Sequence, residues 1–460
     1  MSRPPGRPGL LDADGPLPWA LVRAIPAIRA DPLGYLTGAV RQYGDLVSFP
    51  LPRTPVLLVN DPVAARRVLQ DNHRGYGKQT VQYTSLAAVT GGGMIVAEGP
   101  AWLRRRRLAQ PAFHHGELAA VAEQATLAAQ RLAQEWFGRP GGVIDVAAAT
   151  ARMSLRIVGR TLFDDDLAGS GEQLVEAVSH ALEAVLARAQ SPLPAAQLRS
   201  RAKLRRSLAT IDRTGADVIA RRRARGIDAG DDLLALLLRS SQSEGGLTDL
   251  EMRDELVSLV IAGHETVASS LTWALWLLAD DESRGGSAQA RLHTELDAVL
   301  AGRPAPSGAG WSDLAGLTFT RAVMDEALRL YPPVWLITRR AVSDDSIGGI
   351  EIPAGSLLII SPWLLHRRGQ AWPRPERFDP DRFLDGRVDA LGRSGDYLPF
   401  GAGPRLCIGR DFALVETVLV LATLLREHRV LPAAGTPAPQ VHAAVTLRPR
   451  APLFVRLVRR

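Results

Sequence analysis

Cysteine and lysine are nearly absent from this chain of 460 residues, which contains one cysteine, Cys407, and two lysines, Lys78 and Lys203. A single cysteine excludes an intrachain disulfide, a four-cysteine zinc site and an iron–sulfur cluster held by this chain alone. It fits a reducing, intracellular setting. Since the chain still has 55 basic residues and a net charge of +7, almost all of its positive charge is arginine.

Long uninterrupted apolar runs are also missing. The apolar segment 257–279 contains His264 and Glu265, and the segment 414–425 is much shorter than the roughly 20 residues that a membrane-spanning helix needs. The apolar patch at 18–28 is short and is interrupted by an arginine and a proline. We therefore expect a soluble, cytoplasmic protein with no signal peptide and no membrane anchor.

Linkers rich in glycine, serine or charge do not divide the sequence into blocks. The composition, 46% hydrophobic and 22% charged, allows a large core and excludes a mainly disordered chain. We predict one large domain over residues 1–460, in which residues 1–17 form a flexible N-terminal segment.

The hydrophobic pattern predicts many helices and few strands. Amphipathic segments dominate residues 118–238, and short β-type runs lie at 46–49 and 56–59. Prolines between the two runs suit a hairpin, and the tail from 445 to 458 has the pattern of a closing hairpin. The expected fold class is mainly α with small β-sheets, α+β.

Arginines cluster at two places, residues 104–107 and 221–225, and aromatic residues are not interleaved with them. Nucleic-acid sites commonly combine basic and aromatic side chains. We interpret both clusters as solvated helix faces and expect no nucleic-acid partner.

The segment 249–279 predicts an unusually long helix, which Thr248 and Glu251 begin as a capping box. A polar cluster at 262–266 interrupts its apolar flanks. Gly263 alone costs about 1 kcal/mol relative to alanine in a helix, and a buried carboxylate costs more unless it is partnered. A local rule that is broken in a core helix indicates a functional site.

Several common catalytic motifs can be excluded. His264 and Glu265 begin a zinc-protease helix motif, but its fifth position is Ala268, so the second metal ligand is missing. The three glycines at 91–93 lack the spacing and context of a dinucleotide-binding fingerprint. The sequence contains neither a phosphate-binding Walker loop nor a serine nucleophile elbow.

Cys407 lies in a glycine-rich loop, residues 400–409, that leads into an apolar helix predicted from about residue 410 to 427. A helix start favours thiolate over thiol, and glycines allow backbone to approach the sulfur closely. A thiolate is a metal ligand or a nucleophile. Because a lone cysteine is more often an inert buried side chain, the surrounding pattern must decide.

Four residues spaced around Cys407, namely Phe400, Gly403, Arg405 and Gly409, make this loop resemble the haem-binding loop of the cytochrome P450 family. Three further segments, in the same order, are similar to that family: Ala262-Gly263-His264-Glu265-Thr266, Glu326-x-x-Arg329 and Pro375-Glu376-Arg377-Phe378. The chain is identified as a member of this family, of the soluble bacterial type. The resemblance implies the cytochrome P450 fold, in which a single large domain encloses the haem.

The resemblance also implies a role for particular residues. Cys407 would be the axial ligand of the haem iron, and Glu265 and Thr266 would relay protons. Glu326, Arg329 and Arg377 would form a buried charge network that holds the chain before the cysteine loop. The residues expected to contact the haem, several of them at its propionates, are Trp102, Arg106, Arg339, Phe400 and Arg405, with Arg340 as an alternative to Arg339.

Cofactors and partners follow from the same resemblance. We expect haem b (iron protoporphyrin IX), O2 as co-substrate, and electrons ultimately from NAD(P)H. Because the chain has no cluster cysteines, no flavin motif and no nicotinamide fingerprint, a separate redox partner is implied, namely a ferredoxin with its ferredoxin reductase. The basic run at 104–107 is then a hypothetical steering surface for an acidic ferredoxin.

The substrate is expected to be a hydrophobic small molecule. Segments that line the pocket in the family are mostly aliphatic here, and the residues taken to represent them are Ile95, Ala262, Val334, Ile337 and Val445. We favour hydroxylation of a terpenoid in secondary metabolism. The alternatives are a fatty-acid hydroxylase, an enzyme of the same fold that couples or desaturates, and a haem-thiolate protein that only binds or senses a ligand.

Overall fold

The chain folds into two compact units, each of which is described by itself. The computed structural model describes residues 11–51, 54–137, 140–164, 170–190, 194–226, 232–241, 246–304, 307–384 and 386–460. Unit 1 takes Met1–Thr80, Asp325–Cys407 and Val441–Arg448, and unit 2 takes Val81–Met324, Ile408–Gln440 and Pro449–Arg460. The prediction of one large domain stays a prediction. The expected fold class, mainly α with small β-sheets, is confirmed.

Unit 1 is built on a five-stranded sheet in the order β1-β2-β8-β5-β3. Its strands are β1 (Leu46–Phe49), β2 (Val56–Val59), β3 (Tyr76–Gly77), β5 (Ile337–Ala341) and β8 (Leu357–Ile360). β2 and β8 are parallel, and the other neighbours are antiparallel. The two short β-type runs predicted from the sequence are confirmed as the β1–β2 pair, with Leu46 opposite Val59.

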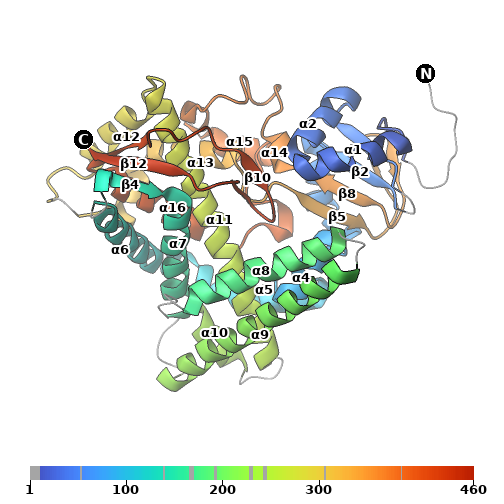
Figure 1. Cartoon of the computed structure of the whole chain (residues 1–460), viewed down its shortest axis with the longest axis horizontal. Helices are drawn as coiled ribbons and strands as arrows, with labels where there is room; N and C mark the ends of the chain where they lie inside the picture. The colour runs from blue at the N-terminus through green and yellow to red at the C-terminus, as the bar shows by residue number, and fades with distance from the viewer. Residues whose placement is uncertain are drawn as a thin grey trace. The chain divides into compact units, whose positions relative to one another are not determined.

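Both faces of this sheet are apolar, because successive side chains of a strand point to opposite faces. Val56 and Leu58 join a core with helices α1 (Pro18–Ala30) and α2 (Pro32–Tyr43), which lie against the sheet at the blue end of the chain (Figure 1). Leu57 joins the opposite core. That second core also contains residues of α3 (Pro62–Arg66), β6 (Asp345–Ile347) and β7 (Ile350–Ile352).

The described part of the predicted flexible N-terminal segment is anchored to unit 1. Leu11 is buried in the core of the sheet, and the Asp14 carbonyl accepts a hydrogen bond from the Ser48 amide at 2.8 Å. Residues 1–10 lie outside the described residues.

The remaining α-helices and strands that lie in unit 1 are short. They are the helices α14 (Pro362–Leu365) and α15 (Arg387–Ser394) and the two-stranded sheet of β10 (Val441–Ala443) and β11 (Leu447–Pro449). The last residue of β11, Pro449, belongs to unit 2. The closing hairpin predicted at 445–458 is wrong, because β11 pairs with β10 whereas β12 (Phe454–Arg459) pairs with β4 and β9. Alternation alone does not reveal which partner a strand takes.

Unit 2 is mainly helical, as the amphipathic pattern of 118–238 predicts. Its helices are α4 (Val81–Thr90), α5 (Gly99–Ala109), α6 (Leu118–Phe137), α7 (Val146–Phe163), α8 (Ser170–Gln190), α9 (Pro194–Arg225), α10 (Leu233–Ser241), α11 (Asp249–Ser283), α12 (Ala288–Val299) and α16 (Arg410–Leu425), and α13 (Thr318–Leu330) begins in unit 2 and ends in unit 1. Helices α8 and α9 run side by side (Figure 1). A three-stranded sheet joins β4 (Val143–Asp145), β12 and β9 (His428–Pro432).

Helix α11 is the long central element of unit 2, and its predicted start is confirmed. The Thr248 hydroxyl accepts from the Glu251 amide, and the Glu251 carboxylate accepts in return from the Thr248 amide, which forms the capping box. The helix packs closely on α7, since a Cβ atom at Gly263 would lie 3.0 Å from Cγ2 of Val158. The mid-helix glycine therefore permits this close approach.

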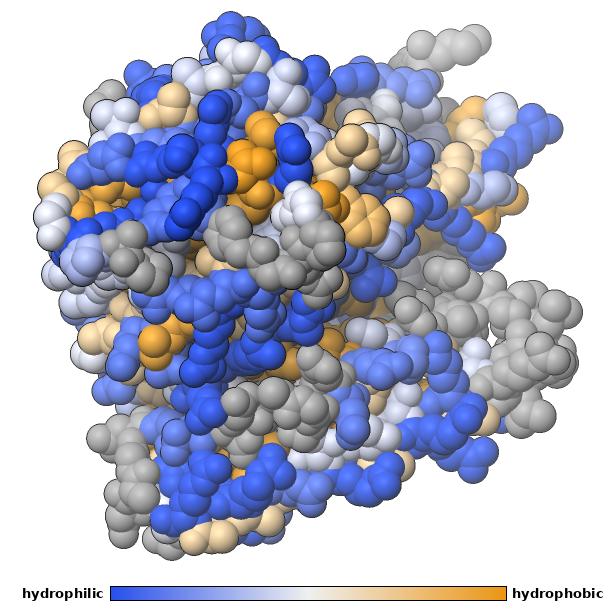
Figure 2. Space-filling model, turned by 60° about the vertical axis from the view of Figure 1, so that its left-hand side comes forward, coloured by the Kyte–Doolittle hydropathy of each residue, from blue (hydrophilic) through white to orange (hydrophobic). Residues whose placement is uncertain are grey.

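The face shown in Figure 2 is mostly hydrophilic, with apolar side chains gathered in separate small groups. In the part of the chain that the structure describes, every helix is either too short or too polar to pass through a lipid bilayer.

Candidate cofactor and catalytic site

The loop before Cys407 in unit 1 is shaped by two glycines in the left-handed region, Gly401 (φ 73°) and Gly403 (φ 66°). A Cβ atom at Gly403 would lie 2.3 Å from the carbonyl oxygen of Leu69, so only glycine fits there. The Cys407 amide donates to the Phe400 carbonyl at 3.0 Å and closes the loop. The Cys407 thiol is exposed. This exposure does not suit an inert buried cysteine and leaves the sulfur accessible to a ligand.

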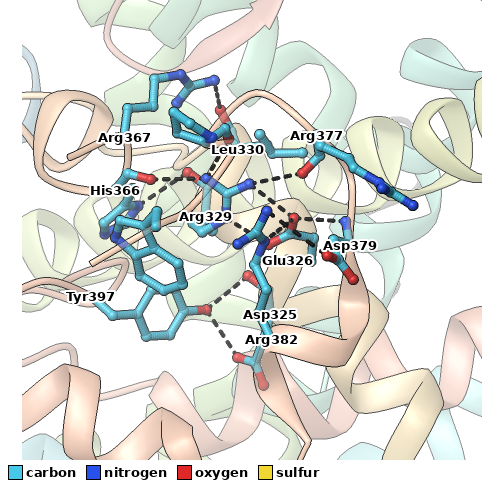
Figure 3. Close-up of polar contacts among 12 residues, drawn as sticks. Asp325, Glu326, Arg329, Leu330, His366, Arg367, Arg377, Asp379, Arg382 and Tyr397 are labelled. Atoms are coloured by element: carbon cyan, nitrogen blue, oxygen red, sulfur yellow. Dashed lines mark hydrogen bonds and ion pairs between the residues drawn. The ribbon is translucent and has the colours of Figure 1, made fainter. Parts of the chain in front are cut away.

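Glu326 and Arg329 form a fully buried ion pair on α13 (Figure 3). Arg329 Nε lies 2.6 Å from Glu326 Oε2, and Nη2 lies 2.9 Å from Oε1. The other donors of Arg329 reach three backbone carbonyls, those of His366 (2.9 Å), Pro375 (2.7 Å) and Arg377 (3.2 Å). Burial raises the pKa of Glu326, and the neighbouring guanidinium of Arg329 opposes this shift. The network joins α13 to two later loops of unit 1.

Arg377 does not supply the charge that the sequence predicted for this network. Its carbonyl accepts from Arg329, but its side chain is exposed and points away from Glu326 (Figure 3). The nearby second guanidinium is that of Arg382, whose Nε lies 3.5 Å from Glu326 Oε1. The sequence contains two Arg-Phe pairs five residues apart, and only the folded turn determines which arginine faces the carboxylate.

His366 is a member of this network that sequence reasoning missed. Its Nε2 accepts from the Leu398 amide at 2.8 Å, so the ring proton lies on Nδ1 and is donated to the Arg329 carbonyl at 3.2 Å. Full burial lowers the pKa of His366 to about 3, which keeps the ring neutral. His366 thus connects α13 with the segment that leads to Phe400. No spacing pattern in the sequence marks it.

Two neighbouring arginines of β5 have different surroundings. Arg340 donates from Nε to the Gln79 carbonyl at 2.7 Å and from Nη1 to the Gly355 carbonyl at 2.9 Å. Arg340 is therefore engaged by backbone. Arg339, which is buried, also donates to backbone, from Nη1 to the Thr338 carbonyl at 2.8 Å, so these contacts do not choose between the two arginines. Arg405, which is half-buried in the cysteine loop, is a further candidate in unit 1 for binding an acidic group.

The structure brings together two of the three pocket candidates of unit 1. Trp335 Nε1 donates to the Ala444 carbonyl at 2.9 Å, so Val334 and Val445 lie on adjoining segments, and both are partly exposed. Ile337 is placed differently. Its side chain is 7% exposed and packs in the core of the five-stranded sheet, so the structure does not support its assignment to the pocket wall.

In unit 2, α5 presents Trp102 and Arg106 one helical turn apart, and both are half-buried. The expectation that residues 104–107 are a solvated basic face is wrong at Arg105. That side chain is 6% exposed and pairs with Glu255 at 2.9 Å, while Arg104 pairs with Glu251. These two arginines hold helices together, so they are poor candidates for steering a redox partner.

The polar cluster of α11 has an accessible face and a buried one. Ala262, Glu265 and Thr266, at positions i, i+3 and i+4, are all half-buried, whereas most of the surrounding helix is fully buried. The Thr266 hydroxyl donates to the Ala262 carbonyl at 2.5 Å. On the other side His264 is buried against the Ala151 backbone, and burial lowers its pKa to about 4.

The side chains present suit a metal ion that is held mainly by a cofactor and takes only one ligand from the protein. Among the residues that the structure describes, no three His, Cys, Asp or Glu side chains converge on a common metal position. The accessible thiol of Cys407 offers one ligand, and arginines stand in the same loop and on β5. A haem fits this set, because its porphyrin supplies four nitrogen ligands and its propionates are acidic.

Comparisons with known proteins agree with this site. A family model described as Cytochrome P450 matches residues 14–456. The chain is 37% identical to cyclooctatin synthase of Streptomyces melanosporofaciens, over 89% of this chain and 88% of that protein. It is 35% identical to pentalenene oxygenase of Streptomyces avermitilis, over 91% of each.

A solved structure agrees as well. The crystal structure of CYP175A1 from Thermus thermophilus superposes with a TM-score of 0.76 at 32% identity, and the match covers 95% of this chain and 98% of that one. The chain therefore belongs to the cytochrome P450 family and is a monooxygenase.

Proposed function

We propose that this enzyme is a haem-thiolate monooxygenase that hydroxylates a terpenoid, with Cys407 as the axial ligand of haem b. The observation that carries the proposal is the accessible Cys407 thiol, the only sulfhydryl of the chain, in a loop whose glycines hold it open. The haem, when bound, supplies the iron at which O2 is activated and an oxygen atom is passed to the substrate. Trp102, Arg106, Arg339 and Arg405 would hold the acidic propionates of the haem, and Phe400 would contact the haem as well.

Thr266 and Glu265 act together in the delivery of protons, Thr266 as an acceptor that orients the proton-bearing group and Glu265 as the acid that passes protons on. Because the Thr266 proton is committed to the Ala262 carbonyl, the Thr266 oxygen turns its lone pairs outward and accepts a hydrogen bond from a proton-bearing group on the accessible face. The Glu265 carboxyl lies on the same face of α11 and passes protons through water.

Electrons come from NAD(P)H through a ferredoxin reductase and a ferredoxin. This part of the proposal rests on the single cysteine, which serves as the haem ligand, so this chain cannot also hold an iron–sulfur cluster.

The substrate class is supported by relatives and by side chains. Relatives are named pentalenene oxygenase and cyclooctat-9-en-7-ol 5-monooxygenase, and Ala262, Val334, Ile95 and Val445 are apolar and at least partly exposed. Apolar side chains of this kind, with few polar groups among them, suit the binding of a cyclic hydrocarbon or its alcohol.

A binding and turnover screen tests this proposal. The holoenzyme is titrated with pentalenene, cyclooctat-9-en-7-ol and palmitic acid while the Soret band is recorded, and each compound is then incubated with O2, NADPH, ferredoxin and reductase. We expect a spin-state shift and a hydroxylated product with at least one terpenoid. Hydroxylation of palmitic acid without turnover of either terpenoid would instead establish the fatty-acid hydroxylase, and a desaturated or coupled product would overturn the assigned reaction.

A further inference from the structure

Three consecutive glycines, 91–93, follow α4 and lie directly against α11, both in unit 2. Gly91 has φ 63°, and a Cβ atom on it would lie 2.2 Å from Asp254 Oδ1. A Cβ atom on Gly93 would lie 2.0 Å from Ser258 Oγ and 2.7 Å from the Asp254 carbonyl oxygen. Any other residue would push the loop away from the helix. The three glycines therefore allow the backbone of residues 91–93 to approach α11 closely.

Two buried carboxylates of α11 bind the amides of this loop. The Gly92 amide donates to Asp254 Oδ2 at 2.7 Å, and the Met94 amide donates to Glu255 Oε2 at 3.2 Å. Asp254 is 6% exposed and Glu255 is 1% exposed. Amide hydrogen bonds to a charged acceptor are stronger than neutral ones. The loop is therefore held at alternate residues.

Arginine side chains form ion pairs with both carboxylates, and these ion pairs link α11 to two more helices, α5 and α9. Arg105 of α5 donates from Nη1 to Glu255 Oε1 at 2.9 Å, and Arg253 Nη1 lies 2.9 Å from Asp254 Oδ1. Arg253 also reaches Asp212 of α9 at 2.7 Å. Since Arg105 lies on the helix that follows the loop, Glu255 fixes both ends of the segment 94–105.

We propose that Asp254 and Glu255 are positioning residues, which with Gly91, Gly92 and Gly93 form a glycine clamp that sets the path of residues 91–98 and so selects substrates by size. The proposal rests on the proposed function, in which Ile95 lines the substrate pocket and α5 carries haem-binding residues. The clamp contacts neither substrate nor cofactor. It acts through Ile95, because the amides of Gly92 and Met94, which precede Ile95 in the chain, are bound by the two carboxylates.

Hydrogen exchange tests the clamp without any added substrate or inhibitor. Asp254→Asn and Glu255→Gln keep the side-chain volumes and remove the charges, and Asp249→Asn is the control, because Asp249 lies on the same helix, is 71% exposed and pairs with Arg223. In the purified holoenzyme, we expect amide exchange in peptides covering 91–98 to rise severalfold in each clamp variant, because a charge-assisted hydrogen bond is replaced by a neutral one of about half its strength, and to stay unchanged in the control. Unchanged exchange at 91–98, or a uniform rise across the whole chain, would overturn the clamp.

Pocket size is read with two probes, imidazole and the bulkier 4-phenylimidazole, whose binding to the haem iron is followed by the Soret shift. We expect the ratio of their dissociation constants to change at least about threefold in the clamp variants and not in Asp249→Asn. Faster exchange at 91–98 with an unchanged ratio would contradict the role in substrate selection. If none of the proteins binds haem, the proposed function fails, while the exchange data still decide whether the clamp exists. If Glu255→Gln does not fold, Asp254→Asn carries both measurements.

Discussion

The guanidinium of Arg329 uses all of its N–H donors within unit 1, two toward Glu326 and three toward backbone carbonyls. A lysine there has too few donors and the wrong geometry for a bidentate pair. Removing one partner of a buried ion pair commonly costs about 3–5 kcal/mol, because the other charge stays buried. This residue therefore stabilises the segment that precedes the cysteine loop.

We predict that Arg329→Ala, which leaves the Glu326 charge buried without its partner, lowers the free energy of unfolding by about 3 kcal/mol or more and reduces haem retention. Arg377→Ala is the matched control. Since the Arg377 side chain is exposed and only its carbonyl joins the network, its removal should change stability by less than about 0.5 kcal/mol. Urea unfolding and the haem content of purified protein measure both. Equal losses in the two variants would restore the role that the sequence suggested for Arg377.

Glu416 of α16 is fully buried, and burial raises its pKa from 4.5 to about 8, while the nearby Ser154 hydroxyl favours the ionised form slightly. Between these two pKa values the folded protein keeps a proton that the unfolded chain releases. The free energy of unfolding therefore falls as pH rises through this range, by up to about 1.4 kcal/mol per pH unit.

We predict that Glu416→Gln removes this pH dependence. The difference in unfolding free energy between variant and wild type should shift in favour of the variant by roughly 2–3 kcal/mol between pH 5.5 and pH 7.5. Urea unfolding at the two pH values measures the shift, and the other titrating groups cancel in the difference. A difference in unfolding free energy that is the same at both pH values would show that Glu416 is ionised in the folded protein.

At the scale of elements, the proposed chemistry depends on the cysteine loop and on α11, and the conformation of the loop depends on its glycines. Gly401 and Gly403 both have positive φ angles, but they differ in their surroundings. A Cβ atom at Gly401 would meet nothing within 4 Å, whereas one at Gly403 would strike the Leu69 carbonyl. The two positions therefore separate the cost of a left-handed residue from the cost of a backbone clash.

We predict that Gly401→Ala costs about 1–2 kcal/mol, the usual penalty for a left-handed alanine, and still gives a haem-loaded protein. Gly403→Ala should be clearly more destabilising and should lose most of its haem, because the loop must shift. Thermal unfolding and the ratio of Soret to protein absorbance compare them. Similar behaviour of the two variants would show that contact with Leu69 does not shape the loop.

The role of α11 leads to a prediction for Thr266. In Thr266→Ala the hydroxyl that orients proton delivery is lost, while the surrounding helix is unaffected, so haem content should stay normal. We expect electrons to be diverted to hydrogen peroxide and the yield of product per NADPH to fall severalfold. Parallel assays of peroxide, NADPH and product measure this. Equal product per electron in variant and wild type would contradict the assigned role.

For the whole molecule, the sequence predicted those features that depend on local spacing. The capping box at Thr248, the β1–β2 hairpin and the glycine-rich loop at Cys407 are each confirmed, because each is determined by residues close together in the chain. The family was likewise recognised from spaced motifs. Features that depend on distant contacts were not predictable in this way.

Three residues illustrate that limit. Arg382 rather than Arg377 faces Glu326 because a turn selects between two similar arginines. His366 acts through Arg329 and Leu398, which lie 37 and 32 residues away. Arg105 is paired with Glu255, which lies 150 residues away, although its basic neighbours suggested a solvated face. In each case the deciding partner is remote in sequence.

The central claim is that the Cys407 thiolate binds haem iron. The most direct test is the carbon monoxide difference spectrum of the reduced protein, compared with that of Cys407→Ser. We predict a strongly red-shifted Soret band in the wild type, and its loss in the variant. A protein without haem, or a histidine-like spectrum that the substitution leaves unchanged, would contradict the account.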